Sequence, residues 1–395
     1  MSGRIHTSIS GRIVRLIVAC VLAGGLTAAC AASNVSTPET RAPSPTATGT
    51  ANGQSCLVGT SWWTIAAHLD LEEPLLAQEI PAAGARYVEL DAKAAAQDQA
   101  DQIDQLVTAG AKVIIIEPGV ESAYLPAVQR AIKAGVAVIS MWQPIEHAAT
   151  LYIAFDPVEQ GRQGASALLA AKPRGTYAII AGDPSQPESQ LFASGTRVSL
   201  QPAADRGDIK IVATVTTPGW DPNLAQQEMA TILSQNGGSV DAVVVEEDDM
   251  ARWGVQQAIE EAGLSGKVAV AGAGLTASIL GLSDVVHGTQ SVEVWGNPER
   301  TAHAAAQAAI ELCHDPDITK VAGSASVTWP GRDPMRAILL APVAITKDNI
   351  SIVINADMYW RQSICPAGPS FGPLVPPACH LGPVPIASAS AQSQP

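Results

Sequence analysis

The sequence predicts an α/β protein built as two doubly wound parallel-sheet lobes. Short apolar runs such as Lys112–Ile116, Val136–Ser140 and Asp241–Val245 have the length and continuous apolarity of strands that are buried on both faces. Stretches with apolar residues at helical spacing lie between them. Repeated strand–helix units of roughly 25 residues favour parallel sheets with helices on both faces. About a dozen such strands are more than one sheet usually carries, so we expect two lobes.

The predicted helices share a common ending. An Ala-Gly pair stands directly before a predicted strand at 83–84, 109–110, 134–135 and 262–263. Glycine just past a helix end adopts the left-handed conformation that closes the helix. The strand–helix alternation begins at Cys56, and the composition changes after Trp360, so we expect the body between these two residues.

Residues 1–29 resemble the signal peptide of a bacterial lipoprotein. Three arginines precede an uncharged run from Leu16 to Leu26, and small residues follow directly before Cys30. The run is too short to span a bilayer as a stable helix. The resemblance implies that residues 1–29 are removed and that Cys30 becomes the lipidated N-terminus. The alternative is an ordinary secretory signal in which Cys30 is incidental.

Residues 30–55 are predicted to be a tether. After Cys30 this segment consists almost wholly of Ser, Thr, Pro, Ala and Gly, which cannot bury a core. A lipid anchor followed by a tether would hold the body just outside the membrane. The predicted location is therefore extracytoplasmic, lipid-anchored to the cell membrane.

The composition excludes several classes of protein. The chain has 395 residues, of which 47% are hydrophobic and 15% charged, which excludes a disordered chain. Its net charge of −14 argues against a nucleic-acid partner, which would require a basic face. Six cysteines in a chain of this length are too few for a disulfide scaffold.

The last segment, residues 361–395, is a tail rich in Pro, Ser and Ala. Cys365 and Cys379 lie fourteen residues apart within it, and in an extracytoplasmic protein we predict that they form a disulfide. Cys56 and Cys313 are left either as a second bridge or as buried thiols, and the sequence does not decide between these.

The body resembles the type I periplasmic binding proteins, specifically the D-xylose-binding branch of the ribose/galactose group. Any one matching stretch alone is a weak signal, but the matching stretches lie in order over nearly the whole body. They are TAGAKVIIIEP (108–118), YIAFDPVEQG (152–161), residues 175–201 around SQLFASG, DAVVVEEDD (241–249), EAGLSGKVAVAG (261–272), HGTQSVEV (287–294) and ILLAPVAITKDNI (338–350).

The resemblance implies two lobes joined by a three-segment hinge that closes on a ligand. Mapped onto this sequence, lobe one comprises 56–154 plus 291–332, and lobe two comprises 155–290 plus 333–360. Relatives that bind DNA begin with a helix-turn-helix, whereas this chain begins with a predicted signal and tether. We therefore expect a monomer that binds a small molecule and no nucleic acid.

Tryptophans occupy the loops that the family uses for ligand, which follow the carboxyl ends of the strands. Trp62 and Trp63 stand in the first of these loops, and Trp220 matches the family's stacking tryptophan. We expect replacement of Trp62 or Trp220 by Ala to weaken ligand binding with little loss of stability. The alternative for each tryptophan is a place in the core.

Polar groups that the D-xylose-binding branch uses for sugar are replaced here. Trp142 and Gln143 stand where that branch has an adjacent Asp and Arg, which clasp sugar hydroxyls. Gly274 replaces a further Asp, and Trp295 replaces a Lys. The cleft therefore exchanges hydrogen-bonding groups for aromatic surface.

Carboxylates are predicted to face these tryptophans. Glu188 occupies a polar position ahead of SQLFASG, and Glu247 or Asp248 replaces an Asn of the family. Indole faces beside carboxylates suit an organic cation, an aromatic ligand or a stacked glycoside. The alternative for the acidic run is a solvated strand end.

The sequence lacks the common motifs of catalysis and cofactor binding. The sequence has no P-loop, no G-x-S-x-G and no H-E-x-x-H, and its histidines show no metal-ligand spacing except His380 beside Cys379. Paired acids could in principle hydrolyse a glycoside. We expect no enzyme, no cofactor and no metal site.

The predicted function is extracytoplasmic capture of a small solute for an ABC importer. By resemblance the solute is a sugar such as a pentose, and the partners are the permease subunits and, through the lipid anchor, the membrane. One alternative is the same fold with a pocket rebuilt for an organic cation or aromatic ligand. Another is a sensory lipoprotein that passes a ligand signal to a membrane receptor.

Overall fold

The computed structural model describes residues 55–64, 69–273 and 279–354. The predicted lipidated Cys30, the predicted Cys365–Cys379 bridge and Gly274 lie outside these residues. These residues form two β-sheets covered by helices, one sheet of seven strands and one of six. This confirms the predicted fold class.

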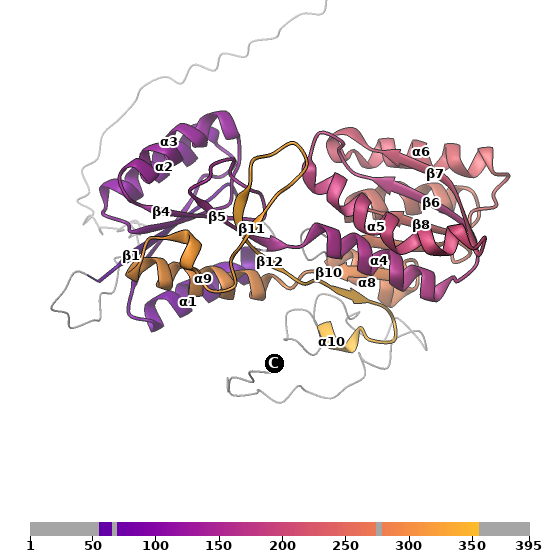
Figure 1. Cartoon of the computed structure of the whole chain (residues 1–395). Helices are drawn as coiled ribbons and strands as arrows, with labels where there is room; N and C mark the ends of the chain where they lie inside the picture. The colour runs from indigo at the N-terminus through magenta and orange to yellow at the C-terminus, as the bar shows by residue number, and fades with distance from the viewer. Residues whose placement is uncertain (1–54, 65–68, 274–278, 355–395) are drawn as a thin grey trace, which may run out of the picture. The chain divides into compact units, whose positions relative to one another are not determined.

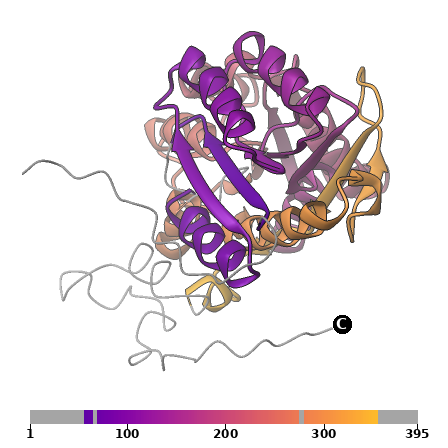
Figure 2. The same ribbon diagram turned by 90° about the vertical axis from the view of Figure 1, so that its left-hand side faces the viewer.

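The first sheet has the strand order β11-β12-β5-β4-β3-β1-β2, and all its pairings are parallel except β11 with β12. Helices α2 and α3 pack on one face and α1 and α9 on the other (Figures 1 and 2). This layered body is called the first lobe below. Its elements are β1 (Leu57–Trp62), α1 (Leu69–Ala82), β2 (Arg86–Asp91), α2 (Ala96–Thr108), β3 (Val113–Ile116), α3 (Glu121–Lys133), β4 (Ala137–Met141), β5 (Thr150–Phe155), α9 (Pro298–His314), the short helix η3 (Ile318–Lys320), β11 (Ala325–Val327) and β12 (Met335–Leu340).

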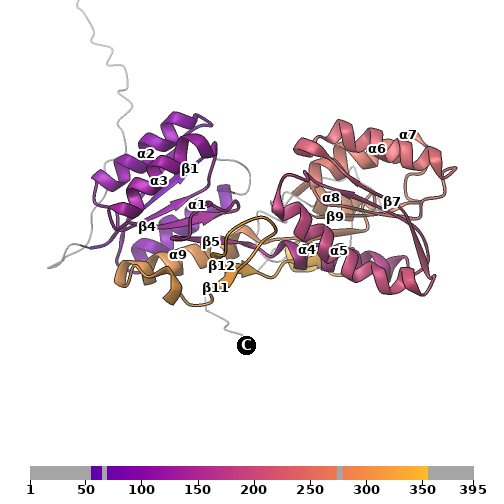
Figure 3. The same ribbon diagram turned by 45° about the horizontal axis from the view of Figure 1, so that its top comes forward.

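The second sheet has the order β13-β10-β9-β8-β6-β7, with β13 antiparallel at one edge. Helices α4 and α5 cover one face, and α6 and α7 the other, as Figure 3 shows. This body is called the second lobe. Its elements are α4 (Pro157–Ala171), β6 (Gly175–Ala181), α5 (Pro187–Asp205), β7 (Ile209–Thr216), η1 (Pro218–Trp220), α6 (Pro222–Gln235), β8 (Ala242–Val245), η2 (Met250–Val255), α7 (Gln256–Glu261), β9 (Ala269–Ala273), α8 (Ile279–His287), β10 (Val292–Trp295), β13 (Val343–Ile345) and α10 (Ser351–Ile354).

The predicted buried strands and helix ends are found. The runs KVIII, VAVIS and DAVVV become β3, β4 and β8, and every residue of these strands is buried. The glycines of the four Ala-Gly joints all have positive φ, between 69° and 89°. Continuous apolar runs therefore predicted the buried strands correctly, and glycine predicted the helix ends.

The chain passes between the two sheets three times. The first passage follows Phe155, one residue after the mapped boundary, whereas the second follows Trp295 and the third follows Leu340. The predicted boundaries at 291 and 333 were therefore too early. Strand β10 pairs with β9 and so belongs to the second sheet, although the mapped boundary placed it in lobe one. Strand β12 pairs with β5 and so belongs to the first sheet, although the mapped boundary placed it in lobe two.

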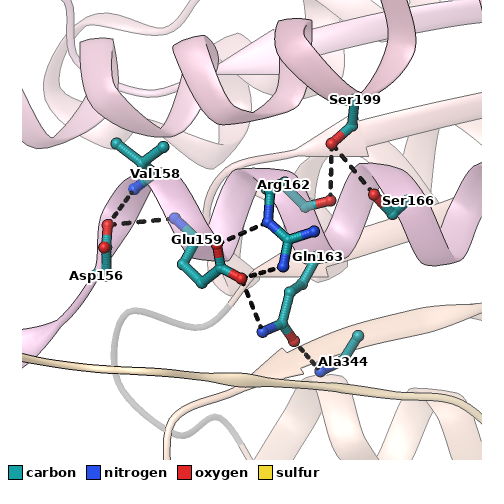
Figure 4. A network of polar contacts seen from close by, with 8 residues as sticks. All are labelled: Asp156, Val158, Glu159, Arg162, Gln163, Ser166, Ser199 and Ala344. Carbon is teal, nitrogen blue, oxygen red and sulfur yellow. Dashed lines mark hydrogen bonds and ion pairs between the residues drawn. The ribbon is translucent and has the colours of Figure 1, made fainter.

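Asp156 fixes the direction of the chain at the first passage (Figure 4). Its side chain accepts hydrogen bonds from the backbone N–H groups of Val158 and Glu159 and so caps α4. Its own N–H donates to the carbonyl of Leu340 at the third passage, over 2.9 Å. On the next turn of α4, Gln163 accepts a hydrogen bond from the N–H of Ala344 in β13. The first and third passages are thus hydrogen-bonded to each other.

A disulfide joins Cys56 to Cys313. Cys56 directly precedes β1 and Cys313 lies in the last turn of α9, so the bond ties the sheet to one of the helices that cover it. Of the two possibilities that the sequence left open, the bridge is the one found. None of the helices among the described residues is both long and apolar enough to cross a membrane.

Candidate ligand-binding cavity

A cavity of about 550 Å³ lies at the carboxyl ends of strands from both lobes. This volume is in the range of small-molecule sites, and the position is where open parallel sheets bind ligands. Five carboxylates, five aromatic rings and one guanidinium contribute to its wall. They belong to Glu117, Glu121, Glu188, Glu247 and Asp249; to Tyr124, Trp142, Tyr152, Phe155 and Trp220; and to Arg332.

A second hollow of similar volume runs along α9, between Leu75 and Leu340. Helix-surface residues form most of its wall, among them His303 and Gln307, and no Phe, Tyr or Trp lines it. It lacks the rings and the strand-end position of the first cavity. The strand-end cavity is therefore the candidate site.

Trp142 forms part of the first lobe's side of the cavity and is held at three points. Its indole N–H donates to a carboxylate oxygen of Glu72 over 2.9 Å, and its carbonyl accepts from the Tyr152 hydroxyl over 2.9 Å. Its ring lies 6.1 Å from that of Phe155, tilted by 42°. The backbone of Trp142 has φ +65°, a conformation that non-glycine residues adopt only when their surroundings impose it.

Trp220 forms part of the second lobe's side. It follows Pro218 and Gly219 in a tight turn, and its N–H donates to the carbonyl of Thr217 over 3.1 Å. The turn is held by Asp183, whose carboxylate accepts from the N–H of Gly219 over 2.7 Å. The indole covers Gly182 so closely that a Cβ there would lie 2.0 Å from the ring. Glycine at 182 therefore makes room for the ring.

Three neighbouring carboxylates form the acidic edge of the second lobe: Glu188, Glu246 and Glu247. Burial raises the pKa of all three, and that of Glu246 to about 7. Glu246 accepts hydrogen bonds from the Ser189 hydroxyl, over 2.7 Å, and from the N–H of Gly182. These bonds oppose the rise, and the charges of Glu188 and Glu247 add to it. Glu188 and Glu247 line the cavity, whereas Glu246 lies fully buried behind them.

The structure brings together five of the nine predicted ligand residues: Trp142, Gln143, Glu188, Trp220 and Glu247. Trp62 and Trp295 end their strands inside hydrophobic cores, at 0% and 4% exposure, and line no part of this cavity. For these two the alternative of a core position describes what is found. Strands β1 and β10 are buried on both faces, so even their last side chains point into packed layers.

Trp63 and Asp248 lie near the cavity without lining it. The Trp63 ring packs against Gly119, a lining residue, so closely that a Cβ on Gly119 would lie 1.9 Å from it. Asp248 is 4% exposed and lies beside Gly281, while its neighbour Asp249 reaches the cavity. Of the two acidic positions considered for the family's Asn, Glu247 is the one that lines the cavity.

Sequence reasoning missed the contribution of the β11–β12 connection. Trp329 in this connection is buried and meets the Tyr152 ring edge-on at 5.4 Å. Arg332, three residues later, lines the cavity and forms an ion pair with Glu146, with N···O 2.8 Å. The Trp-Pro-Gly-Arg sequence indicates a turn here, but the family's ligand loops follow parallel strands, and this turn does not. No cluster of three or more metal-ligating side chains occurs among the residues with described positions.

The chain forms two α/β lobes, passes between them three times, and lines one aromatic and acidic cavity from both. This arrangement is that of a solute-binding protein of the periplasmic type. A comparison with family models agrees, because the model of the periplasmic binding protein domain matches residues 75–315. The chain belongs to this family. Membership makes it a binding protein and not an enzyme, as the sequence predicted.

Individual relatives show the same resemblance. The chain is 30% identical to the D-xylose-binding periplasmic protein of Escherichia coli (strain K12) over 283 residues, which are 71% of this chain and 83% of that protein. It is 31% identical to the D-xylose-binding periplasmic protein of Haemophilus influenzae, over 67% of this chain and 79% of the other. Among solved structures, the periplasmic ribose ABC transporter protein of Conexibacter woesei superposes with a TM-score of 0.63 at 19% identity, covering 78% of this chain and 97% of that one.

Proposed function

We propose that this chain is the sugar-binding component of an ABC importer, and that it captures a neutral sugar or sugar alcohol of about pentose size. One observation carries the proposal: a cavity of about 550 Å³ is lined from both lobes by indole rings and carboxylates. Rings stack on the apolar faces of sugars, and carboxylates accept hydrogen bonds from hydroxyl groups. The similarity to two D-xylose-binding proteins supports this class of ligand.

Ligand capture would proceed by closure of the lobes on the solute. Trp142 and Gln143 approach it from the first lobe, and Glu188, Trp220 and Glu247 from the second. A ligand that touches both lobes stabilises the arrangement in which both sets of contacts are made, and this preference drives closure. The first and third passages, joined by the bond between Asp156 and Leu340, would bend as one unit.

The proposed place of work is outside the cell membrane, with a lipid on Cys30 and residues 30–55 as the tether. The Cys56–Cys313 disulfide supports an oxidising compartment. Lipid attachment is tested by mass spectrometry of the membrane-extracted protein. Cleavage before Cys30 with a diacylglyceryl mass on that residue is the expected result, whereas an unmodified N-terminus released into the medium would refute it.

The ligand class is tested by titration of intrinsic tryptophan fluorescence in the purified protein. D-xylose, xylitol, D-glucose and tetramethylammonium are the probes, and Trp220→Ala is the matched variant. We expect a saturable change with at least one neutral probe, lost in the variant. A response to tetramethylammonium alone would replace the proposal by its rival, an organic-cation site, which the five lining carboxylates favour.

A further inference from the structure

We propose that Arg332, on the β11–β12 connection, is a specificity-determining ligand residue. Its guanidinium binds oxygen atoms of the solute on the side opposite Glu188. It thereby supplies hydrogen bonds of the kind that the D-xylose-binding branch makes with the Asp and Arg that Trp142 and Gln143 replace. This inference rests on the proposed function and narrows it, because it selects a neutral hydroxylated ligand over a cation. The β11–β12 connection, which joins antiparallel strands, would thus bind ligand in addition to the loops that follow parallel strands.

The placement of Arg332 depends on a tight turn with a clear sequence origin. Trp329, Pro330, Gly331 and Arg332 form a turn in which the N–H of Arg332 donates to the carbonyl of Trp329 over 3.2 Å. Gly331 has φ +72°, and Pro-Gly at the two central positions is typical of a type II turn. The first residue of this turn is anchored, because Trp329 is buried against Tyr152. The buried Trp329 therefore fixes the position of the turn, and with it the position of Arg332.

The second lobe presents Trp220 by the same device. Thr217, Pro218, Gly219 and Trp220 repeat the pattern, with Gly219 at φ +71° and a hydrogen bond of 3.1 Å between the first carbonyl and the fourth N–H. In both turns the fourth residue lines the cavity. One turn thus supplies an aromatic plane and the other a planar cation.

The electrostatic surroundings of Arg332 favour a role toward ligand over a purely structural one. Its side chain is 20% exposed, and its ion pair is with Glu146, whose side chain is 50% exposed. Because the Glu146 side of this pair is open to solvent, the pair contributes little to stability. The guanidinium has five N–H donors in a fixed fork, more than one carboxylate uses, so donors are available for ligand oxygens.

Arg332 also acts on the carboxylate across the cavity. Its charge opposes the burial effect that raises the pKa of Glu188, which belongs to the first turn of α5 in the second lobe. A guanidinium that donates and a carboxylate that accepts are the two groups that clasp vicinal hydroxyls. Arg332 is the one cationic side chain on the cavity wall within the described ranges, and its charge would repel an organic cation.

The test is isothermal titration calorimetry of the wild-type protein, Arg332→Gln, Arg332→Lys and the control Arg130→Gln, each with D-xylose, xylitol and tetramethylammonium. Arg130 is an exposed arginine in the last turn of α3, where it pairs with Asp104 of α2, and it does not line the cavity. We expect Arg332→Gln to weaken binding of the neutral ligand at least tenfold and Arg332→Lys to restore only part of it, because an ammonium lacks the planar fork. Arg130→Gln should bind as the wild type does.

The outcomes separate the inference from the function on which it rests. Unchanged affinity for a neutral ligand in Arg332→Gln would overturn the role of Arg332 and leave the proposed function standing. Absence of any neutral ligand in the wild type would overturn both. Tighter binding of tetramethylammonium to Arg332→Gln than to the wild type, without sugar binding, would identify a cation site and overturn both as well. Thermal unfolding of each variant shows whether its fold is retained.

Discussion

The indole N–H of Trp142 donates its hydrogen bond to the carboxylate of Glu72, a side chain that is wholly buried in α1. The other oxygen of Glu72 accepts from the hydroxyl of Thr301, in the first turn of α9. One carboxylate therefore links a ring on the cavity wall to the helix that begins after the second passage between the lobes.

Replacement of Glu72 by Ala is expected to impair both stability and binding. It removes the acceptor of the Trp142 indole N–H, at about 1–3 kcal/mol, whereas the Thr301 hydroxyl can still donate to the carbonyl of Pro298. Because the indole then loses its anchor, ligand affinity should fall as well. Urea unfolding and fluorescence titration measure the two effects. The control is Thr301→Val, which removes one donor only; equal affinity in Glu72→Ala and wild type would show that Trp142 needs no anchor.

Trp62 and Trp220 are expected to separate stability from binding. Trp62 is fully buried among apolar side chains of α1, α9 and the first sheet, so Trp62→Ala should lower the free energy of unfolding by about 3–5 kcal/mol. Trp220 is partly exposed in its turn, so Trp220→Ala should cost much less stability and should abolish the fluorescence response to ligand. Chemical denaturation and titration of both variants provide the comparison, and a stable Trp62→Ala protein that fails to bind would reverse the assignment.

The contrast between these two residues shows the limit of sequence reasoning at the site. Both follow the pattern of a tryptophan at or after a strand end, and nothing in the local sequence states which way a ring turns. Trp62 turns inward because β1 is buried on both faces, whereas Trp220 stands beyond β7 on a Pro-Gly turn. Direction at a strand end is set by the layers that pack on it, which are distant in sequence.

The fold was more predictable because its signals are local. Continuous apolar runs such as Val113–Ile116 and glycine at helix ends determine strand and helix positions without reference to distant residues. The passages between the lobes were less predictable, because they depend on pairing between distant strands. Strand β10 joins the second sheet by pairing with β9, and β12 joins the first by pairing with β5. Arg332 was missed because its turn joins antiparallel strands.

Glu246 is expected to make stability depend on pH. Its pKa is raised from 4.5 to about 7 by burial, so the folded state holds a proton that the unfolded state releases. This contribution to stability is fully present below pH 4.5 and is lost as pH rises to about 7. The loss amounts to roughly 3 kcal/mol.

Glu246→Gln keeps a neutral side chain at every pH, and its amide oxygen can accept from Ser189 and Gly182. The difference in unfolding free energy between this variant and the wild type should therefore grow from pH 4.5 to 7 and stay constant above. Denaturation curves at pH 4.5, 6, 7 and 8 measure it. A difference that does not change with pH would mean that the pKa of Glu246 is the same in the folded and the unfolded protein.

The Cys56–Cys313 bond is expected to stabilise the first lobe. Its two ends are 257 residues apart, so it restricts the unfolded chain strongly. The double variant Cys56→Ser with Cys313→Ser should lose about 2–4 kcal/mol of unfolding free energy. The same loss is expected when the wild type is unfolded in the presence of a reductant. If reduction leaves the unfolding midpoint unchanged, the bond has no part in stability.

The strand order of the first sheet also constrains the sequence of events during synthesis. Strand β12 pairs with β5 and separates it from β11, so this sheet is unfinished until residue 340 has been made. Five of the six strands of the second sheet, by contrast, lie in the continuous stretch 175–295. Most of the second sheet can therefore form before the first sheet is complete, although its edge strand β13 follows only at Val343–Ile345. Until β12 has been made, β5 presents an unpaired strand edge to neighbouring chains.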